Sequence, residues 1–224
     1  MKIPRIAPLA ALALAALSTD VPWSVAGESP LRMVTVAGRA EVQLPGTTRW
    51  TAAKLRMDLG PGAAARTLQG RLTLTTGSGQ AFRLAGLSRL SLPEAGAPDL
   101  PTRARLDAGT IWAAVLPGSP PNEQLEVQTT AVTVLVGSGG TEVTVGRDGS
   151  ALVRVFHGTV ACTRPGADPQ WSRGLAEGQE LIVPATGEPG PPRKIDREKI
   201  NVDWTKWNED QDSAGGFRVA PPPK

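Results

Sequence analysis

Short apolar runs separated by glycine-rich segments dominate the chain, and the clearest of them lie between residues 127 and 160. Val132, Val134 and Val136 alternate with other residues, so their side chains would face one side of a strand. β-branched residues at a period of two, followed by a turn signal such as Asp148-Gly149, are typical of strands joined in hairpins. This stretch predicts the β core of the protein.

The same pattern extends over residues 31–185, where turn signals recur about every eight to twelve residues. Gly38 predicts a tight hairpin, and the segments 77–80 and 137–140 predict further turns. We therefore expect an all-β domain of two packed sheets in a rolled, jelly-roll-like or short β-solenoid-like arrangement. A proline-containing loop at residues 93–101 is a possible boundary between two lobes.

A helix is predicted near the C-terminus, after a Pro/Gly linker at residues 186–193. Within residues 194–212, Ile200, Trp204 and Trp207 fall at i, i+4 and i+7, which places them on one helical face. We expect this short amphipathic helix to dock on the β domain through these three side chains.

The two ends of the chain are predicted to lie outside the folded domain. Residues 1–26 resemble a secretory signal peptide, with a basic start, an apolar segment at residues 9–17 and small residues before Gly27. That apolar segment is shorter than the roughly 20 residues that a membrane span needs. We expect an exported protein, periplasmic or extracellular, with no stable membrane span after signal cleavage. Residues 213–224 are predicted to form a disordered tail.

Charge and cysteine content narrow the class of protein. The 24 Lys and Arg residues and 21 Asp and Glu residues give a net charge of +3, and the basic residues form no block. Nucleic-acid binding needs a concentrated basic face, so we expect no nucleic-acid partner. The one cysteine, Cys162, excludes an internal disulfide and a multi-cysteine metal site.

No set of residues with catalytic spacing is present. His157 is the one histidine, and no nucleophile or acidic cluster accompanies it at motif spacing, so a structural or solvent-facing role is favoured. Cys162 is expected to be an unreactive thiol. The glycine-rich segment 137–140 lacks the lysine of a phosphate-binding loop. We therefore predict no catalytic, metal-binding or cofactor-binding residues, and no enzyme activity.

Several short motifs, taken in order, resemble the FecR domain family of periplasmic and secreted bacterial proteins. The resemblance covers about residues 31–212 and depends on the order of motifs that are individually weak. The motifs are VTVAGRAEVQLPGTTRW at 34–50, LDAGTIW at 106–112, VQTTA at 127–131, GTEV at 140–143, HGTV at 157–160 and EGQ at 177–179.

The resemblance implies a non-enzymatic module of the cell envelope that binds, scaffolds or signals to another envelope protein. The sequence departs from the family pattern at Thr130, where proline is usual, and at residues 136–141, which are two residues longer and lack an arginine. The best-known relatives carry a cytoplasmic sigma-factor-binding segment and a membrane helix before this domain, and neither is recognisable here. Sigma-factor regulation is therefore not carried over.

Two surfaces are open as binding sites at this stage. The candidate interaction turn consists of Gly137, Ser138, Gly139, Gly140 and Thr141, because extended backbone around it could recruit a partner strand. The alternative is a carbohydrate- or peptidoglycan-binding module that uses an exposed Trp171. An envelope hydrolase is disfavoured because paired catalytic carboxylates and a nucleophile with its base are both missing.

Overall fold

The computed structural model describes residues 30–93, 100–166 and 170–217. The described part of the protein is mostly β, with 52% of the described residues in strands and one α-helix near the C-terminus. The strands are β1 (Leu31–Gln43), β2 (Trp50–Ala52), β3 (Asp58–Leu59), β4 (Ala64–Thr75), β5 (Ala81–Leu84), β6 (Arg89–Ser91), β7 (Thr102–Val115), β8 (Leu125–Gln128), β9 (Thr133–Val145), β10 (Ala151–Thr163), β11 (Ser172–Ala176), β12 (Gln179–Val183) and β13 (Arg193–Lys194). The helices are the 3-10 turns η1 (Pro121–Glu123) and η2 (Arg197–Lys199) and the α-helix α1 (Val202–Gly215).

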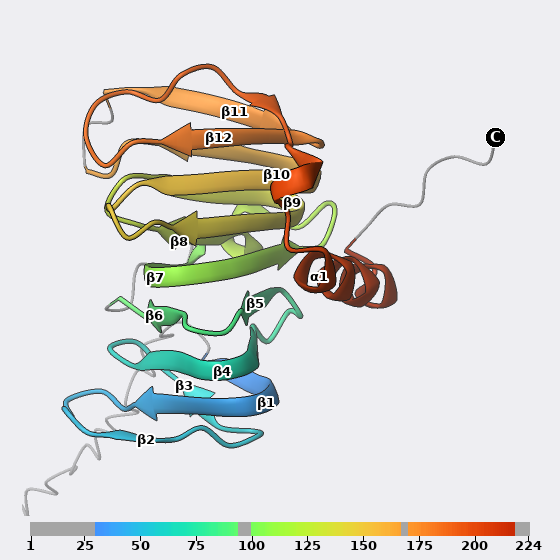
Figure 1. The fold of residues 1–224 in the computed structure, drawn as a ribbon. Coiled ribbons are helices and arrows are strands. Elements are labelled where there is room, and N and C mark those ends of the chain that lie inside the picture. The colour runs from blue at the N-terminus through green and yellow to red at the C-terminus, as the bar shows by residue number, and fades with distance from the viewer. Residues whose placement is uncertain (1–29, 94–99, 167–169, 218–224) are drawn as a thin grey trace, which may run out of the picture.

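The strands form one hydrogen-bonded sheet whose main path runs β13-β12-β10-β9-β8-β7-β5-β4-β1-β2. β6 pairs with both β4 and β7, so β4, β5, β7 and β6 close a small four-stranded barrel. Figure 1 shows the strands stacked from β2 at one end to β11 and β12 at the other, with α1 along one side. This confirms the predicted all-β fold with a rolled sheet and one C-terminal helix.

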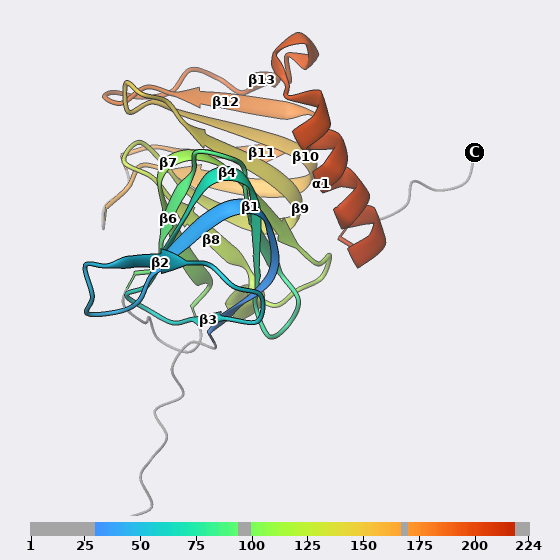
Figure 2. The same cartoon turned by 60° about the horizontal axis from the view of Figure 1, so that its bottom comes forward.

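Each of the five long strands bends at one glycine with a positive φ. These are Gly38 in β1, Gly70 in β4, Gly109 in β7, Gly139 in β9 and Gly158 in β10. The halves of a long strand on either side of the bend pair with different neighbours: the first half of β10 pairs with β12, and the second with β11. The bends therefore fold one continuous ladder into two facing layers, and the curvature of β1 and β4 is visible in Figure 2.

One large hydrophobic cluster fills the space between the layers. It extends from Leu31 in β1 to Val183 in β12 and includes the fully buried Phe82, Leu106 and Leu125. The cluster draws on strands before and after residues 93–101, although residues 94–99 of that loop lie outside the described part of the chain. Strands on both sides of this loop thus contribute to the same hydrophobic cluster.

Two of the four turns predicted at glycine-containing segments are present in the structure. Residues 146–150 do form a hairpin turn, in which the Gly146 N–H donates to the Ser150 carbonyl at 2.8 Å, and residues 76–80 close the β4–β5 hairpin. The hairpin predicted at Gly38 is wrong, because β1 pairs with β4 on both sides of that glycine. The segment 137–140, expected to form a turn or a bulge, forms no turn because β9 runs through it, but the register between β9 and β10 shifts between Val136 and Ser138, as in a β-bulge.

The predicted helix over residues 194–212 is correct only in its later part. Arg193 and Lys194 pair with β12 as strand β13, and the Ile195 N–H donates to the Gly178 carbonyl at 2.9 Å. These hydrogen bonds hold residues 193–195 in extended backbone. Asn201 then caps α1 by accepting from the Trp204 N–H at 3.2 Å, so the helix begins at Val202.

Helix α1 also runs further than predicted and ends at Gly215. Gly216 follows in the left-handed conformation, with φ of 77°, and Phe217 is buried. The first residues of the predicted tail 213–224 are therefore ordered parts of the fold, whereas residues 218–224 lie outside the described part. The predicted signal peptide, residues 1–26, also lies outside it. Among the described helices, none has the length and apolar character that a bilayer crossing requires.

Candidate functional site

A buried polar cluster joins helix α1 to the sheet, and we call it the helix junction. Its members come from four elements and all are at least nine-tenths buried. They are Arg83 on β5, Trp112 on β7, His157 on β10, and Asn208 and Asp212 on α1. Charged groups this deeply buried are costly unless they are paired, so their contacts decide whether the helix can dock.

Asp212 is the centre of the helix junction. Its carboxylate accepts from the Arg83 guanidinium at 2.5 Å and from the Trp112 indole N–H at 2.9 Å. The same carboxylate lies 3.0 Å from Nε2 of His157. The Arg83 guanidinium therefore provides the counter-charge for Asp212, and the helix side chain is tied to three different strands.

Gly140 on β9 makes room for this cluster. A Cβ atom placed on Gly140 would meet the Asp212 carboxylate and would lie 2.6 Å from Cε1 of His157. Such distances do not occur between real atoms of these kinds, so any side chain here would push the helix residue away. Gly140 is not one of the glycines with a positive φ, so its backbone conformation does not require glycine. Glycine is needed here because a side chain would collide with Asp212 and His157.

Gly140→Ala should therefore destabilise the protein by about 1–3 kcal/mol, the usual cost of overpacking a buried site. Urea unfolding measures the change. Gly137→Ala is the matched control, because its Cβ would meet Thr159 at an ordinary 3.5 Å, and its effect should stay within about 0.5 kcal/mol. Equal effects of the two substitutions would contradict the role assigned to Gly140.

A second buried network fastens the segment that precedes α1. Arg154 on β10 donates to Glu180 at 3.0 Å and to Glu142 at 3.1 Å, and also to the Lys199 carbonyl at 3.2 Å. Arg193 on β13 donates to the other oxygen of Glu180 at 2.8 Å. Burial raises the pKa of the Glu142 carboxyl above its usual range, and the neighbouring Arg154 opposes that rise. The helix junction and the Arg154 network together hold residues 193–217 against the β-sheet.

The arrangement of strands and helix can be compared with solved structures. The fold resembles that of a candidate anti-sigma factor. Two crystal structures of such a protein from Parabacteroides distasonis, at 1.65 and 2.50 Å resolution, match the chain with TM-scores of 0.51 and 0.50 and identities of 18% and 19%. The match covers 65% and 64% of this chain, and it spans 64% and 62% of the crystallised chains. No protein-family model and no curated protein matches the sequence.

The candidate interaction turn, residues 137–141, occupies a different environment from the one predicted. Gly139 and Gly140 pair with β10 on one side and with β7 on the other. Their backbone is therefore already engaged in the sheet and does not offer a free edge to a partner strand. The structural role of this segment is to bend β9 at Gly139 and to seat α1 at Gly140.

The predicted docking residues of the helix contribute unequally. Trp204 is 4% exposed and packs with Trp112 and Phe217, whereas Trp207 is half-buried and stacks on Trp204 with ring centroids 5.6 Å apart. Ile200 lies before the first residue of α1 and lines a cleft. Sequence reasoning missed Asn208 and Asp212, although they continue the Trp204 face at i+4 and i+8.

Trp171, the aromatic residue of the alternative glycan-binding surface, is buried. Trp171 is 5% exposed and belongs to the large hydrophobic cluster, so it cannot stack on a sugar. Trp50 is partly exposed but is covered by Arg66 and Arg89, whose guanidinium carbons lie 4.2 and 5.4 Å from its ring. The exposed tryptophan surface predicted from the sequence is therefore wrong for Trp171.

Cys162 is completely buried in the core, as expected for an unreactive thiol, and burial raises its pKa from 9.0 to about 12. Iodoacetamide should leave the folded protein unmodified at pH 8 and should alkylate it once denatured. Because the folded state binds the thiol proton more tightly, this residue's contribution to stability should fall as the pH rises from 9 towards 12. Rapid alkylation of the native protein would contradict this burial.

The described residues contain no grouping of three or more His, Cys, Asp or Glu side chains with metal-binding geometry. His157 sits in the helix junction beside Asp212, and neither of its buried ring nitrogens, Nδ1 or Nε2, makes a hydrogen bond to the described residues. The polar residues with the most contacts in this structure thus connect elements of the fold. What the arrangement can do is hold a C-terminal helix in a fixed position on a β scaffold.

Proposed function

We propose that this protein is an exported, non-enzymatic FecR-like module of the cell envelope that binds another protein. The main support for this proposal is the fold, which resembles that of a candidate anti-sigma factor across about two thirds of the chain. The ordered sequence motifs that resemble the FecR family, from residue 34 to residue 179, support the same assignment.

The partner-binding surface is proposed to be the free edge of β11. Within the described part of the chain, β11 pairs with β10 alone, and the other strands with a single neighbour, β2, β3 and β13, have only two or three residues each. Ser172, Gly174 and Ala176 on this strand are exposed. An unpaired strand edge presents backbone donors and acceptors that can accept an added strand from another chain. This surface replaces the interaction turn that the sequence predicted at residues 137–141.

Export is the part of the proposal that fractionation tests. Cells that produce the full chain with a C-terminal tag should release it in the periplasmic or extracellular fraction, and N-terminal sequencing should show cleavage within residues 16–27. Recovery of the uncleaved chain from the cytoplasm would overturn the proposed location. Replacing Leu12 and Leu14 in the apolar segment by Lys is the matched control, because a charged segment should not be exported.

Protein binding is tested by purification of the mature chain from its own envelope extract. We expect one protein to be retained in a fixed ratio to the bait, and retention to be insensitive to added polysaccharide. A heat-denatured bait serves as the control. Retention of glycan in place of protein would favour the alternative function, against which the buried position of Trp171 argues.

A further inference from the structure

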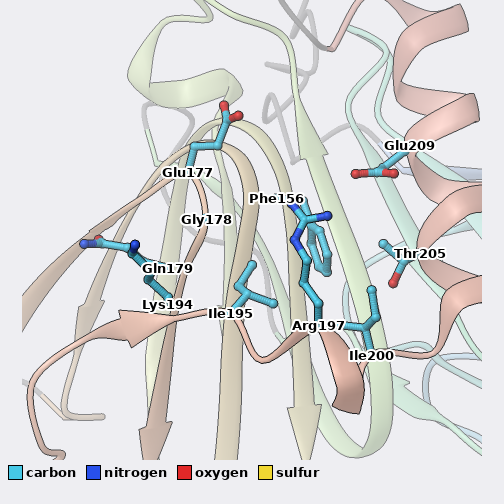
Figure 3. A pocket seen from close by; sticks show the side chains of 10 residues that line it. All are labelled: Phe156, Glu177, Gly178, Gln179, Lys194, Ile195, Arg197, Ile200, Thr205 and Glu209. Atoms are coloured by element: carbon cyan, nitrogen blue, oxygen red, sulfur yellow. The ribbon is translucent and has the colours of Figure 1, made fainter.

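A cleft with a volume of about 530 Å³ lies between helix α1 and the turn that joins β11 to β12. Figure 3 shows the cleft with the side chains of its lining residues. Sites for small molecules usually have volumes of about 300–1,000 Å³, combining apolar surface with a few convergent polar groups. The cleft has both features, and none of the helix-junction residues lines it, although its Gln179 accepts from the Ala176 N–H at the end of β11 at 2.8 Å.

The charged side chains of the cleft have no partners within it. Glu177 stands on the β11–β12 turn and Glu209 on α1, so the two carboxylates come from opposite walls. Lys194 and Arg197 come from the segment between those walls. No ion pair joins any of these four side chains to another described residue, although charged neighbours such as Arg193 are paired. The cleft thus offers both anionic and cationic groups to a ligand.

The remaining lining is suited to an apolar side chain and a hydrogen-bonding group. Phe156, Ile195 and Ile200 supply apolar surface. Thr205 is 4% exposed, and its hydroxyl has no hydrogen-bond partner in the described structure. In Figure 3 the side chains of Arg197, Thr205 and Glu209 are directed into the space between α1 and the strands. A buried hydroxyl without a partner is uncommon in native proteins and calls for one.

We propose that this cleft binds a short peptide with free ends. Glu209 would accept from the peptide's ammonium group, and Arg197 would donate to its carboxylate. An apolar side chain of the peptide would pack on Phe156, Ile195 and Ile200. A ligand of a single charge sign fits less well, because it would bring a group of like charge close to either Glu209 or Arg197.

Calorimetric titration of the full chain with the tripeptide Ala-Phe-Ala tests this site. We expect saturable binding at or below millimolar concentration. The same peptide with an acetylated N-terminus and an amidated C-terminus should bind at least tenfold more weakly, because it lacks both charges. Absence of saturable binding, or equal affinity for the two peptides, would overturn the proposal.

Two variants then assign the ends of the peptide. Glu209→Gln should weaken binding of the free peptide about tenfold, the loss expected for one charge-assisted hydrogen bond, and should change binding of the N-acetylated peptide much less. Arg197→Gln should have the mirror-image effect with the C-amidated peptide. Glu123→Gln, on η1 outside the cleft, is the control and should bind as the original chain does. Unchanged affinity in both cleft variants would overturn the site, whatever the outcome for partner binding at β11.

Discussion

Asp212→Ala should lower the free energy of unfolding by about 3–5 kcal/mol, the cost of removing one partner from a buried ion pair. The substitution leaves the Arg83 guanidinium and the Trp112 indole N–H buried without their acceptor. An uncompensated buried cation is more costly than the loss of the pair's own attraction. Helix α1 should therefore detach from the sheet before the β roll unfolds.

Urea unfolding followed by tryptophan fluorescence measures this effect, since Trp112 and Trp204 lie at the junction. Limited proteolysis should show faster cleavage within residues 195–217. Asp210→Ala is the matched control, because Asp210 is exposed on the same helix and pairs with Lys206 at 3.0 Å. An exposed pair contributes at most about 1 kcal/mol. Similar losses in the two variants would show that the helix junction does not hold α1.

Gly158→Ala should cost more than about 4 kcal/mol or prevent folding, which places it among the most damaging substitutions a glycine can undergo. Gly158 has a φ of 86°, and an added Cβ would collide with the Ser138 carbonyl oxygen of the paired strand β9. The strand cannot yield, because Gly139 faces the His157 carbonyl in the same way from the other side. Both the left-handed backbone and the close approach of the strands require glycine here.

Gly174→Ala on β11 is the control for this bend. Gly174 has no positive φ, and an added Cβ would meet no atom within 4 Å, so its effect should stay within about 0.5 kcal/mol. Circular dichroism and urea unfolding compare the two variants. A Gly158→Ala protein as stable as the Gly174→Ala protein would contradict the claim that the bends form the two layers.

The strands were predictable from local sequence, whereas the bends were not. Alternating valines such as Val132, Val134 and Val136 define a strand wherever they occur, because their side chains must share one face. A glycine between two apolar runs can end a strand or bend it. Gly38 and Gly139 bend theirs because pairing continues on both sides, and pairing depends on residues far away in the sequence.

The helix was found by its tryptophans, but its polar contacts were not. The spacing of Trp204 and Trp207 marks a helical face without any knowledge of the sheet. Asp212 carries no such local signal, since its partners Trp112 and Arg83 lie 100 and 129 residues earlier in the chain. A buried carboxylate cannot be recognised until the opposing guanidinium is known. The helix face that carries Trp204, Asn208 and Asp212 was the one available hint.

Exposure of Trp171 was mispredicted for a similar reason. A tryptophan near proline, glycine and polar residues has the local sequence of a surface loop. The residue is buried because it adjoins β11, which covers the second half of β10. Such coverage follows from the order of strands in the sheet, which local pattern does not determine.

Site-specific photo-crosslinking in the native envelope tests whether this protein binds another protein at the unpaired edge of β11. A photoreactive residue replaces Ala176 on β11 in one variant and Glu123 on η1 in the other, because these positions lie on different elements. Both variants must first unfold as the original chain does. We expect one discrete protein adduct from position 176 and none from position 123. No adduct from position 176, or equal adducts from both positions, would contradict it.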